Sequence, residues 1–314
     1  MSAHKPTQAR RLLVTGRHGF VGETLARFLD DSAERGRWTL TDVPLSLDLR
    51  DAAATKHLVT EARPDAVLHL AAQSAVPDSF RDPETTLQVN LVGTLHLLQA
   101  LSEAGFSGRF VYVGTGDVYG LVPASELPVA ETRLPRPRNP YAVSKLAAEA
   151  LCWQWHVCHA MDLIIARPFN HIGYGQSERF AISDFARQIA EIKNGGRPSI
   201  VHAGNLDVTR DFTDVRDVVA AYFALLDRGQ SGEIYNVCSG IETSVGSLLQ
   251  QLIALAGVEA TIERDPLRAR GAEQQRVCGD PRKIRNATGW TPMTPIRTSL
   301  AAALQFWEGR LAHD

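Results

Sequence analysis

The sequence has no long apolar run and no excess of charge of one sign, and each absence excludes a class of protein. No run of apolar residues is long enough to span a bilayer, so no membrane partner is expected. The formal net charge of −2 gives no overall basic surface, so no nucleic-acid partner is expected. Met1–Arg11 carries charges with no hydrophobic segment behind it, which does not fit a secretory signal.

Cysteine is scarce as well. The four cysteines, Cys152, Cys158, Cys238 and Cys278, lack the spacing of a metal-ligand set, so no metal site is expected. They are typical of reduced thiols in a cytoplasmic protein. What is present is ordinary for a globular protein, with 44% hydrophobic and 22% charged residues. A chain of 314 residues is long enough for about two domains with a substantial core.

A glycine-rich turn follows the first apolar segment. The sequence indicates a buried strand over residues 11–15 and a helix over residues 23–30. Between them the glycines have the spacing Gly-x-x-Gly-x-x-Gly. Strand, glycine turn and helix in this order bring backbone N–H groups to a pyrophosphate, which predicts a dinucleotide site, although an ordinary strand-to-helix turn is the alternative. The predicted cofactor contacts in this turn are Gly16, His18, Gly19, Phe20, Val21 and Gly22.

An acidic residue follows the second predicted strand, which covers residues 38–41. The Asp42 carboxylate can accept hydrogen bonds from both hydroxyls of an adenosine ribose and repel a 2′-phosphate, which favours NAD over NADP. Arg17 and His18 lie nearby in the sequence and can bind a phosphate. The cofactor is therefore predicted as NAD or NADP, with NAD(H) slightly favoured.

A tyrosine and a lysine stand four residues apart behind Pro140, which suits a first helical turn. On a helix, Tyr141 and Lys145 lie on one face, one turn apart. A phenol titrates near ~10, and a nearby ammonium lowers its pKa toward working pH. Tyr141 can then exchange a proton with a carbonyl oxygen during hydride transfer, while Thr115, after a predicted strand over 110–113, bonds the same oxygen. A satisfied phenol and a solvated lysine on a helix surface are the alternative.

These residues together resemble the extended short-chain dehydrogenase/reductase family, the NAD-dependent epimerases and dehydratases. The resemblance runs from about Leu12 to Trp307. It implies an α/β fold with a Rossmann-type doubly wound parallel sheet and a smaller, interleaved C-terminal substrate domain. The NAD(P)-binding domain is expected over residues 1–179, with segments returning near 205–240, and the substrate domain over residues 180–314.

The resemblance implies further cofactor contacts. Asp48 would hydrogen-bond the adenine amine and Leu49 would pack on the ring, although a cap on the following helix is an equal alternative for Asp48. Small residues after the predicted strand over 66–70 would let the cofactor lie close to the backbone. Lys145 would also hold the nicotinamide ribose. The remaining implied cofactor contacts are Leu70, Ala71, Ala72, Tyr141 and Arg167.

The segment Arg167–Gly173 resembles the Arg-Pro-Phe-Asn-His segment of GDP-sugar dehydratases and reductases. It implies that Asn170 binds the diphosphate or the sugar, whereas His171 is expected to be a loop histidine with satisfied hydrogen bonds. Lys193, at the end of a predicted helix, is placed to meet a phosphate, with a solvated helix end as the equal alternative. Asp117 is a candidate substrate contact, and a cap or turn is its alternative.

Two later segments resemble nucleotide-binding segments of the same family. In residues 204–212, Arg210 would grip the substrate diphosphate, because a guanidinium fork matches phosphate oxygens. In residues 265–273, paired arginines precede a glutamate, which implies that Arg270 and Glu273 contact the nucleotide; a solvated loop is the alternative.

Within the family the resemblance is strongest to GDP-sugar reductases, which implies reduction of the C4 ketone of GDP-4-dehydro-6-deoxy-D-mannose to GDP-D-rhamnose with NAD(P)H. Thr115 would then contact the substrate. Gly116 has no proton to give and Asp117 is shorter than the glutamate of the dehydratases, which argues against a 4,6-dehydratase. A dehydratase, a nucleotide-sugar 4-epimerase and an NAD(P)-binding regulator without turnover stay as alternatives.

The resemblance also implies an assembly. In this family, two helices form the interface of a homodimer, and here they correspond to residues 90–101 and the helix that begins near Tyr141. The leucine stripe over 90–101 is expected to belong to the core rather than to the interface, although periodicity does not separate the two. The sequence therefore predicts a cytoplasmic, NAD(P)-dependent enzyme that forms a homodimer and takes a GDP-sugar substrate.

Overall fold

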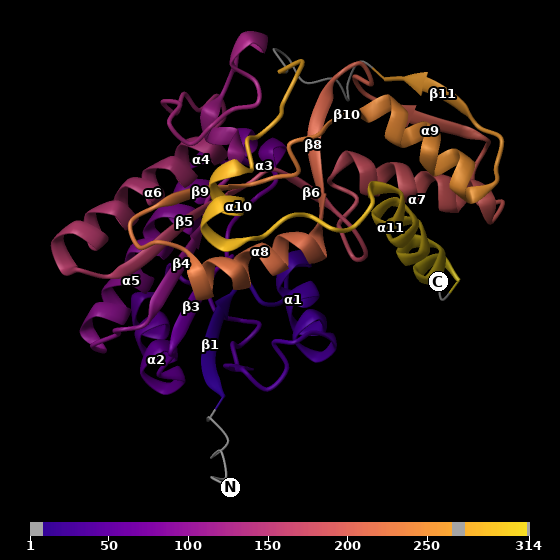
Figure 1. The fold of residues 1–314 in the computed structure, drawn as a ribbon. Coiled ribbons are helices and arrows are strands. Elements are labelled where there is room, and N and C mark those ends of the chain that lie inside the picture. The colour runs from indigo at the N-terminus through magenta and orange to yellow at the C-terminus, as the bar shows by residue number, and fades with distance from the viewer. Residues whose placement is uncertain (1–8, 266–273, 313–314) are drawn as a thin grey trace, which may run out of the picture. The chain divides into compact units, whose positions relative to one another are not determined.

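Among the described residues, six strands between residues 10 and 237 form a sheet in the order β2-β1-β3-β4-β5-β9 (Figure 1). The sheet belongs to a computed structural model that describes residues 9–265 and 274–312. Strands β1 to β5 pair in parallel, which confirms the predicted α/β Rossmann-type fold. The strands are β1 (Arg10–Thr15), β2 (Trp38–Leu40), β3 (Ala66–His69), β4 (Arg109–Val113), β5 (Asp162–Pro168) and β9 (Ile234–Val237).

The chain divides into two units and passes between them several times. The first unit takes the chain up to Gly114, then Asn139–Ala166 and Tyr222–Ile234. The second unit takes Thr115–Arg138, Arg167–Ala221 and the residues from Tyr235 on. The predicted division into a cofactor domain up to residue 179 and a substrate domain from residue 180 stays a prediction.

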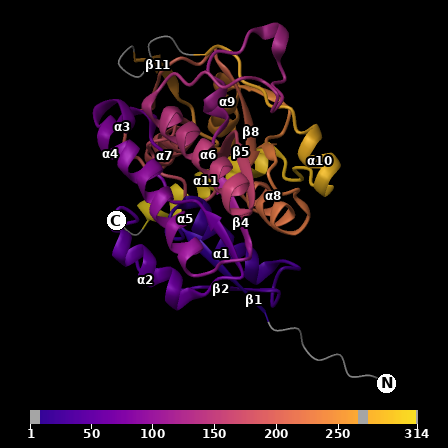
Figure 2. The same ribbon diagram turned by 90° about the vertical axis from the view of Figure 1, so that its left-hand side faces the viewer.

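One face of the sheet in the first unit is covered by α2, α5 and α6 (Figure 2). Apolar side chains such as Leu97, Leu101 and Cys152 pack there against Phe110 and Ile165 of the strands. The helices of the first unit are α1 (Phe20–Asp31), α2 (Ala52–Ala62), α3 (Val76–Arg81), α4 (Pro83–Leu87), the π-helical turn η1 (Gln88–Val92), α5 (Gly93–Glu103) and α6 (Pro140–His159).

The stacked rings of Phe28 on α1 and Phe223 on α8 (Val215–Arg228) join these two helices, with ring centroids 5.6 Å apart. Trp38 of β2 packs on the same Phe223 ring. Helix α8 begins in the second unit and ends in the first, and its second half carries these contacts. The order of the strands reverses between β1 and β3, and in sheets of this kind ligands bind beyond the carboxyl ends of the strands at such a point.

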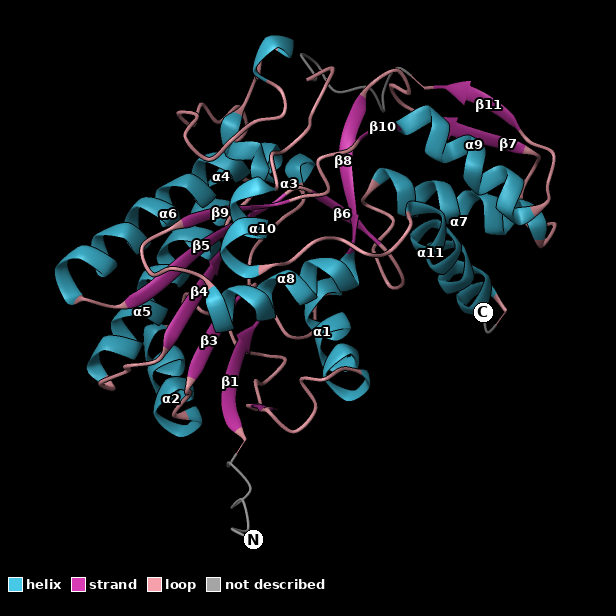
Figure 3. Ribbon diagram, viewed as in Figure 1, coloured by secondary structure: helices cyan, strands magenta, loops and turns pink. Residues whose placement is uncertain are grey.

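The second unit has its own core. It contains a sheet in the order β10-β8-β6 and a strand pair β11-β7, with α7, α9 and α11 packed through Ile189, Leu249 and Leu304 (Figure 3). Its other elements are η2 (Gly116–Tyr119), η3 (Ala124–Glu126), β6 (Asn170–Ile172), α7 (Ala181–Lys193), β7 (Ile200–Ala203), β8 (Thr209–Asp214), β10 (Glu242–Ser244), α9 (Val245–Ala256), β11 (Thr261–Arg264), α10 (Arg282–Thr288) and α11 (Ile296–Leu311).

Several predicted helices begin elsewhere than the sequence indicated. Helix α1 begins at Phe20, three residues before Glu23, because Gly19 is its N-cap and the glycine turn leads directly into it. The helix predicted over 90–101 begins with the π-helical turn and continues as α5 to Glu103. The alternative role of Asp48 as a cap is wrong, since Asp51 caps α2 by accepting from the N–H groups of the second and third helical residues.

None of the helices in the described ranges combines the length and apolar character that crossing a membrane requires.

Candidate functional site

The glycine turn is built so tightly that side chains are excluded from two of its positions. Gly16 has a φ of 73°, and a Cβ there would lie 2.7 Å from the Ala71 nitrogen. A Cβ on Gly22 would lie 2.3 Å from the Arg17 carbonyl oxygen. No side chain caps the start of α1, where Gly19 stands at the N-cap. The turn therefore presents backbone and a helix N-terminus to a ligand, which is the chemistry that a pyrophosphate requires.

The turn is joined to the segment after β2. Arg17 donates to the Thr41 carbonyl oxygen at 3.2 Å, and its guanidinium lies 3.8 Å from the fully exposed Asp42 carboxylate. The imidazole of His18 hydrogen-bonds the Val43 carbonyl oxygen at 2.9 Å. The structure thus brings Asp42 together with a cation that reduces its repulsion of a phosphate.

The predicted adenine contacts are held by neighbours within the first unit. Asp48 forms an ion pair with Arg50 at 2.6 Å, and this guanidinium keeps the pKa of the carboxyl below its usual value. Leu49 is buried, and its Cβ lies 3.0 Å from the position of a Cβ on Gly93. Leu70, Ala71 and Ala72 follow β3 and are partly buried. Their role as cofactor contacts stays a prediction.

Helix α6 carries the predicted proton donor and its lysine. Asn139 caps the helix by accepting from the Ala142 N–H at 2.7 Å, which sets the first turn at Pro140 and Tyr141. Tyr141 is partly exposed, whereas Lys145 is 2% exposed. The Lys145 ammonium lies over the Tyr112 ring, 4.6 Å from its centroid. The lysine is therefore not a solvated surface residue, and that alternative is wrong.

The electrostatics around Lys145 are those of a buried cation. Burial lowers the pKa of Lys145 to about 8, while the Glu149 carboxylate acts in the opposite direction. Burial raises the pKa of the Tyr112 phenol and of the Cys152 thiol, so both are neutral near pH 7. The ammonium can thus stabilise a negative charge that develops on the neighbouring Tyr141 phenol.

A buried hydrogen-bond chain that the sequence did not reveal lies beneath the glycine turn. The Thr15 hydroxyl is 2.6 Å from Nδ1 of His69, and Nε2 of His69 is 2.9 Å from the Thr94 hydroxyl. Thr94 donates to the Asn90 carbonyl oxygen at 2.6 Å, and the Ala71 N–H donates to Thr15. Because Thr94 uses its proton on Asn90, it accepts from Nε2–H, and His69 accepts from Thr15 at Nδ1.

The same chain reaches the helix of the proton donor. The Asn90 amide donates to the Ser144 hydroxyl at 2.9 Å, and Ser144 donates to the Tyr141 carbonyl oxygen at 2.7 Å. Burial, with a smaller contribution from the Lys145 charge, lowers the pKa of His69 to about 3, so the ring is neutral at working pH. The glycine turn and the first turn of α6 are therefore positioned by one buried network.

In the second unit, Thr115 stands at the N-cap of η2, immediately after the residue that ends the first unit's segment. Its hydroxyl oxygen accepts from the Asp117 N–H at 3.2 Å, which leaves the hydroxyl proton for donation to a substrate oxygen. Gly116 packs on Phe169, where a Cβ would lie 3.0 Å from the ring. Asp117 is an exposed residue of the first turn of η2.

The predicted diphosphate contacts lie on neighbouring strands of the second unit. Asn170 on β6 is exposed and pairs in register with Phe212 of β8. Arg210, two residues earlier on β8, donates to the carbonyl oxygens of Thr209 and Gln274 at 2.7 and 2.8 Å. The structure thus brings Asn170 and Arg210 together on one small sheet.

On β5 and β6, Arg167 is buried and His171 is half-buried. The Arg167 guanidinium lies over the Tyr119 ring, 4.9 Å from its centroid, inside the second unit. His171 hydrogen-bonds the Phe169 carbonyl oxygen at 3.0 Å, and burial lowers its pKa. The ring is hydrogen-bonded as the sequence indicated, but His171 lies in strand β6 and not in a loop.

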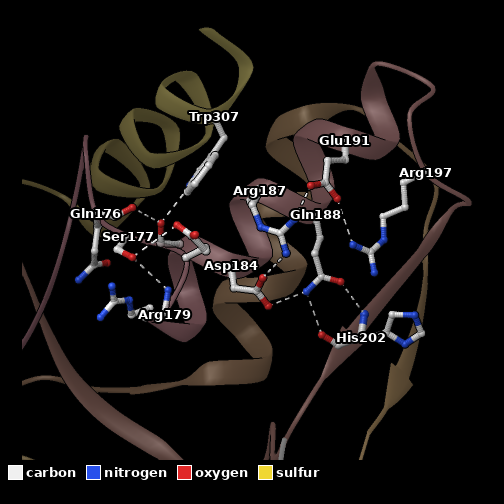
Figure 4. Close-up of polar contacts among 12 residues, drawn as sticks. Gln176, Ser177, Arg179, Asp184, Arg187, Gln188, Glu191, Arg197, His202 and Trp307 are labelled. Atoms are coloured by element: carbon white, nitrogen blue, oxygen red, sulfur yellow. Dashed lines mark hydrogen bonds and ion pairs between the residues drawn. The ribbon is translucent and has the colours of Figure 1, made fainter. Parts of the chain in front are cut away.

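Helix α7 is held to β7 by a buried polar network (Figure 4). Gln188 is fully buried, and its amide pairs with both the N–H and the carbonyl oxygen of His202, at 2.9 and 3.0 Å. Asp184 accepts from Gln188 and from Arg187, so it orients the amide. Lys193, at the end of the same helix, bonds Glu308 of α11 at 2.7 Å. This network orders the strand that leads into the segment of Arg210.

Two predicted contacts, Arg270 and Glu273, lie outside the described residues. Within the described residues there is no group of three or more His, Cys, Asp or Glu side chains that could hold a metal ion. Sequence reasoning missed Glu149, which is 3% exposed. Its spacing of four residues from Lys145, in a helix already predicted, was a signal that could have identified it.

Comparison with known proteins connects this geometry to a family. Residues 13–302 match the family described as GDP-mannose 4,6 dehydratase. The chain is 49% identical, over 305 residues, to the GDP-6-deoxy-D-mannose reductase of Pseudomonas aeruginosa, and the match covers 97% of this chain and 99% of that protein.

Solved structures agree with this match. RMD from Pseudomonas aeruginosa, solved in complex with NADPH, has a TM-score of 0.91 and 49% identity, covering 96% of this chain and 99% of that one. The UDP-glucose 4-epimerase of Thermus thermophilus, solved in complex with NAD, has a TM-score of 0.83 and 29% identity, covering 95% and 99%.

Proposed function

Because this chain belongs to the extended short-chain dehydrogenase/reductase family, in the group described as GDP-mannose 4,6 dehydratase, we propose that it reduces the C4 ketone of GDP-4-dehydro-6-deoxy-D-mannose to GDP-D-rhamnose with NAD(P)H. The observation that carries the chemistry is the buried Lys145 ammonium, one helical turn from Tyr141. The observation that carries the substrate is the 49% identity to a GDP-6-deoxy-D-mannose reductase over nearly the whole chain.

The glycine turn fits a dinucleotide, because the backbone at Gly16 and Gly22 leaves no room for side chains and no side chain caps α1. Gly16, Gly19 and Gly22 would hold the pyrophosphate, Asp42 the adenosine ribose and Lys145 the nicotinamide ribose. A reduced nicotinamide supplies the hydride when it is bound. His18, Phe20, Val21, Asp48, Leu49, Leu70, Ala71, Ala72 and Arg167 are the further proposed contacts.

Tyr141 donates the proton to the oxygen at C4 as the ketone is reduced. The buried Lys145 ammonium stabilises the phenolate that this donation leaves, since charges interact more strongly in a site that excludes water. Thr115 donates a hydrogen bond to the same oxygen, using the hydroxyl proton that its contact with Asp117 does not require. Gly116 brings no acid into the loop, which suits a reduction rather than a dehydration.

The substrate diphosphate is bound by Arg210 and Asn170, which lie on neighbouring strands. A guanidinium with two donors engaged by backbone carbonyls is held in place, and its fork geometry suits phosphate oxygens. Lys193 would join them only by releasing Glu308. Asp117, Arg270 and Glu273 are the further proposed substrate contacts.

The proposed function is tested by the oxidation of NADPH and of NADH, followed at 340 nm, with freshly made GDP-4-dehydro-6-deoxy-D-mannose. Oxidation is expected with the ketone and not with GDP-mannose, which has no C4 ketone. The configuration of the product at C4, determined by NMR, separates GDP-D-rhamnose from the 6-deoxy-talose epimer. A folded protein that oxidises neither cofactor would refute the proposal, and NAD retained through purification would then favour the epimerase.

Cofactor choice depends on Asp42 and Arg17. The exposed Asp42 carboxylate favours NADH, because it accepts from ribose hydroxyls and repels a 2′-phosphate, whereas Arg17 at 3.8 Å lets NADPH bind as well. The ratio of the two rates in the same assay measures this preference.

The protein forms a homodimer through α5 and α6. Helix α6 exposes Val143, Trp153 and Val157, and Val92 is exposed just before α5. Large apolar side chains that gather on one part of a surface are typical of protein interfaces. Light scattering of the purified protein is expected to give about twice 34.4 kDa, and Trp153→Glu with Val157→Glu should give the monomer. A monomeric parent protein would contradict the dimer.

Four unpaired thiols fit a cytoplasmic enzyme.

A further inference from the structure

The row that begins with Tyr141 and Lys145 continues to a third ionisable residue, Glu149, one further turn along α6. Glu149 is 3% exposed and Lys145 is 2% exposed. The Glu149 carboxylate occupies the space beside Gly114, because a Cβ on Gly114 would lie 2.5 Å from its Oε1. The missing side chain at Gly114, the residue after β4, therefore makes room for a buried carboxylate one helical turn beyond the catalytic lysine.

Burying a carboxylate is costly unless it is paired, so its position requires a reason. The ionisable groups that face Lys145 are Tyr141, Glu149 and Cys152 on α6, Tyr112 on β4 and His69 on β3. Burial keeps Tyr112 and Cys152 protonated and His69 uncharged near pH 7. Of these groups, Glu149 is the one whose ordinary state at that pH is an anion.

We propose that Glu149 is a positioning residue of this reductase, whose carboxylate keeps Lys145 charged beside Tyr141. The inference rests on the proposed function for its kinetic consequence, but the charge of Lys145 can be measured without substrate. Glu149 touches neither substrate nor cofactor in this role. It acts through Lys145, which in turn stabilises the phenolate of the proton donor.

The sign of the effect follows from the charge that is removed. Burial alone favours the neutral amine, and the anion of Glu149 opposes this, so Lys145 keeps a pKa of about 8. Glu149→Gln removes the anion and keeps the shape, so the pKa of Lys145 falls. The lysine then loses its proton at lower pH, and the alkaline limb of the kcat profile shifts to lower pH with it.

The first test is an NMR titration of protein labelled with ¹³C at the lysine side chains, with the Lys145 signal assigned by its loss in Lys145→Met. The pKa of Lys145 is expected to fall by about one unit in Glu149→Gln, which corresponds to about a tenfold change in the protonation equilibrium. An unchanged pKa would overturn the inference. This result does not depend on which sugar the enzyme reduces, so failure of the inference and failure of the proposed function are distinguishable.

The second test is the pH profile of kcat. Glu149→Gln is expected to lower kcat about tenfold near pH 8.5 and little near pH 6. Glu149→Asp keeps the charge and should restore the alkaline limb. Cys152→Ala removes a buried, uncharged side chain from the same helix and should leave the limb in place. An equal loss of kcat at every pH in Glu149→Gln would indicate a structural role and overturn the inference.

Should Glu149→Gln fail to fold, Gly114→Ala tests the same effect of the Glu149 carboxylate on Lys145. It displaces the carboxylate and leaves Glu149 itself unchanged. The added Cβ forces the carboxylate away from its position beside residue 114. The pKa of Lys145 is again expected to fall, and an unchanged value in a folded Gly114→Ala variant would also contradict the inference.

Discussion

Tyr141→Phe is expected to lower the turnover of GDP-4-dehydro-6-deoxy-D-mannose about 10³-fold, while the affinity for NADPH changes little. The phenol supplies the proton for the C4 oxygen, and phenylalanine keeps the ring but has no proton to give. The affinity depends on the glycine turn and Lys145, which the change does not touch. Steady-state kinetics measures the first effect, and quenching of NADPH fluorescence measures the second.

A second tyrosine of the first unit provides the matched control. Tyr222 on α8 is 1% exposed, and within the described ranges its hydroxyl has no hydrogen-bond partner. Tyr222→Phe removes an identical hydroxyl that makes no hydrogen bond within the described ranges, so it should leave turnover intact and not lower stability. Turnover that survives in Tyr141→Phe would refute the assigned mechanism, and a regulator without turnover would keep its output in that variant.

Gly22→Ala is expected to weaken NADPH binding about 100-fold or more and to lower the stability of the first unit by about 3 kcal/mol. The new Cβ would lie 2.3 Å from the Arg17 carbonyl oxygen and 2.5 Å from the Arg17 Cα. Neither atom is the flexible end of a side chain, so the turn or helix α1 has to move. Isothermal calorimetry with NADPH and urea unfolding measure the two effects.

Gly309→Ala is the control, because it makes the same chemical change at a helical position that has open space for the added Cβ. Gly309 lies in α11, and nothing would lie within 4 Å of a Cβ there. Alanine in a helix interior is favoured over glycine by about 0.5–1 kcal/mol, so this variant should be more stable and should bind NADPH normally. Normal NADPH binding by Gly22→Ala would show that the turn does not hold the cofactor.

Local patterns in the sequence were sufficient to predict much of the fold. The strand predicted over 110–113 covers all of β4 except its first residue, and the glycine turn between β1 and α1 was identified by its spacing. The pair Tyr141 and Lys145 was placed on one helix because a period of four residues is visible in one dimension. These features depend on neighbours within a few residues, which is why sequence alone predicts them.

Features that depend on distant contacts were not predicted. His69 and Thr15 are separated by 54 residues, and Gln188 pairs with a strand 14 residues later. Nothing in the sequence near Glu149 indicates that it occupies the space beside Gly114. Such pairs arise only when the sheet and its helices have packed, so periodicity carries no information about them.

The hydrogen-bond chain through His69 has one further consequence. It begins at the Ala71 N–H, which can only donate, and it ends at the Asn90 carbonyl oxygen, which can only accept. Every hydroxyl and ring proton between them must therefore point the same way, and no rearrangement can reverse the direction. A hydrogen-bond chain that conducts protons must be able to adopt both donor–acceptor orientations. This chain can adopt only one, so it does not conduct protons. The proton that Tyr141 gives away must return to it by another route.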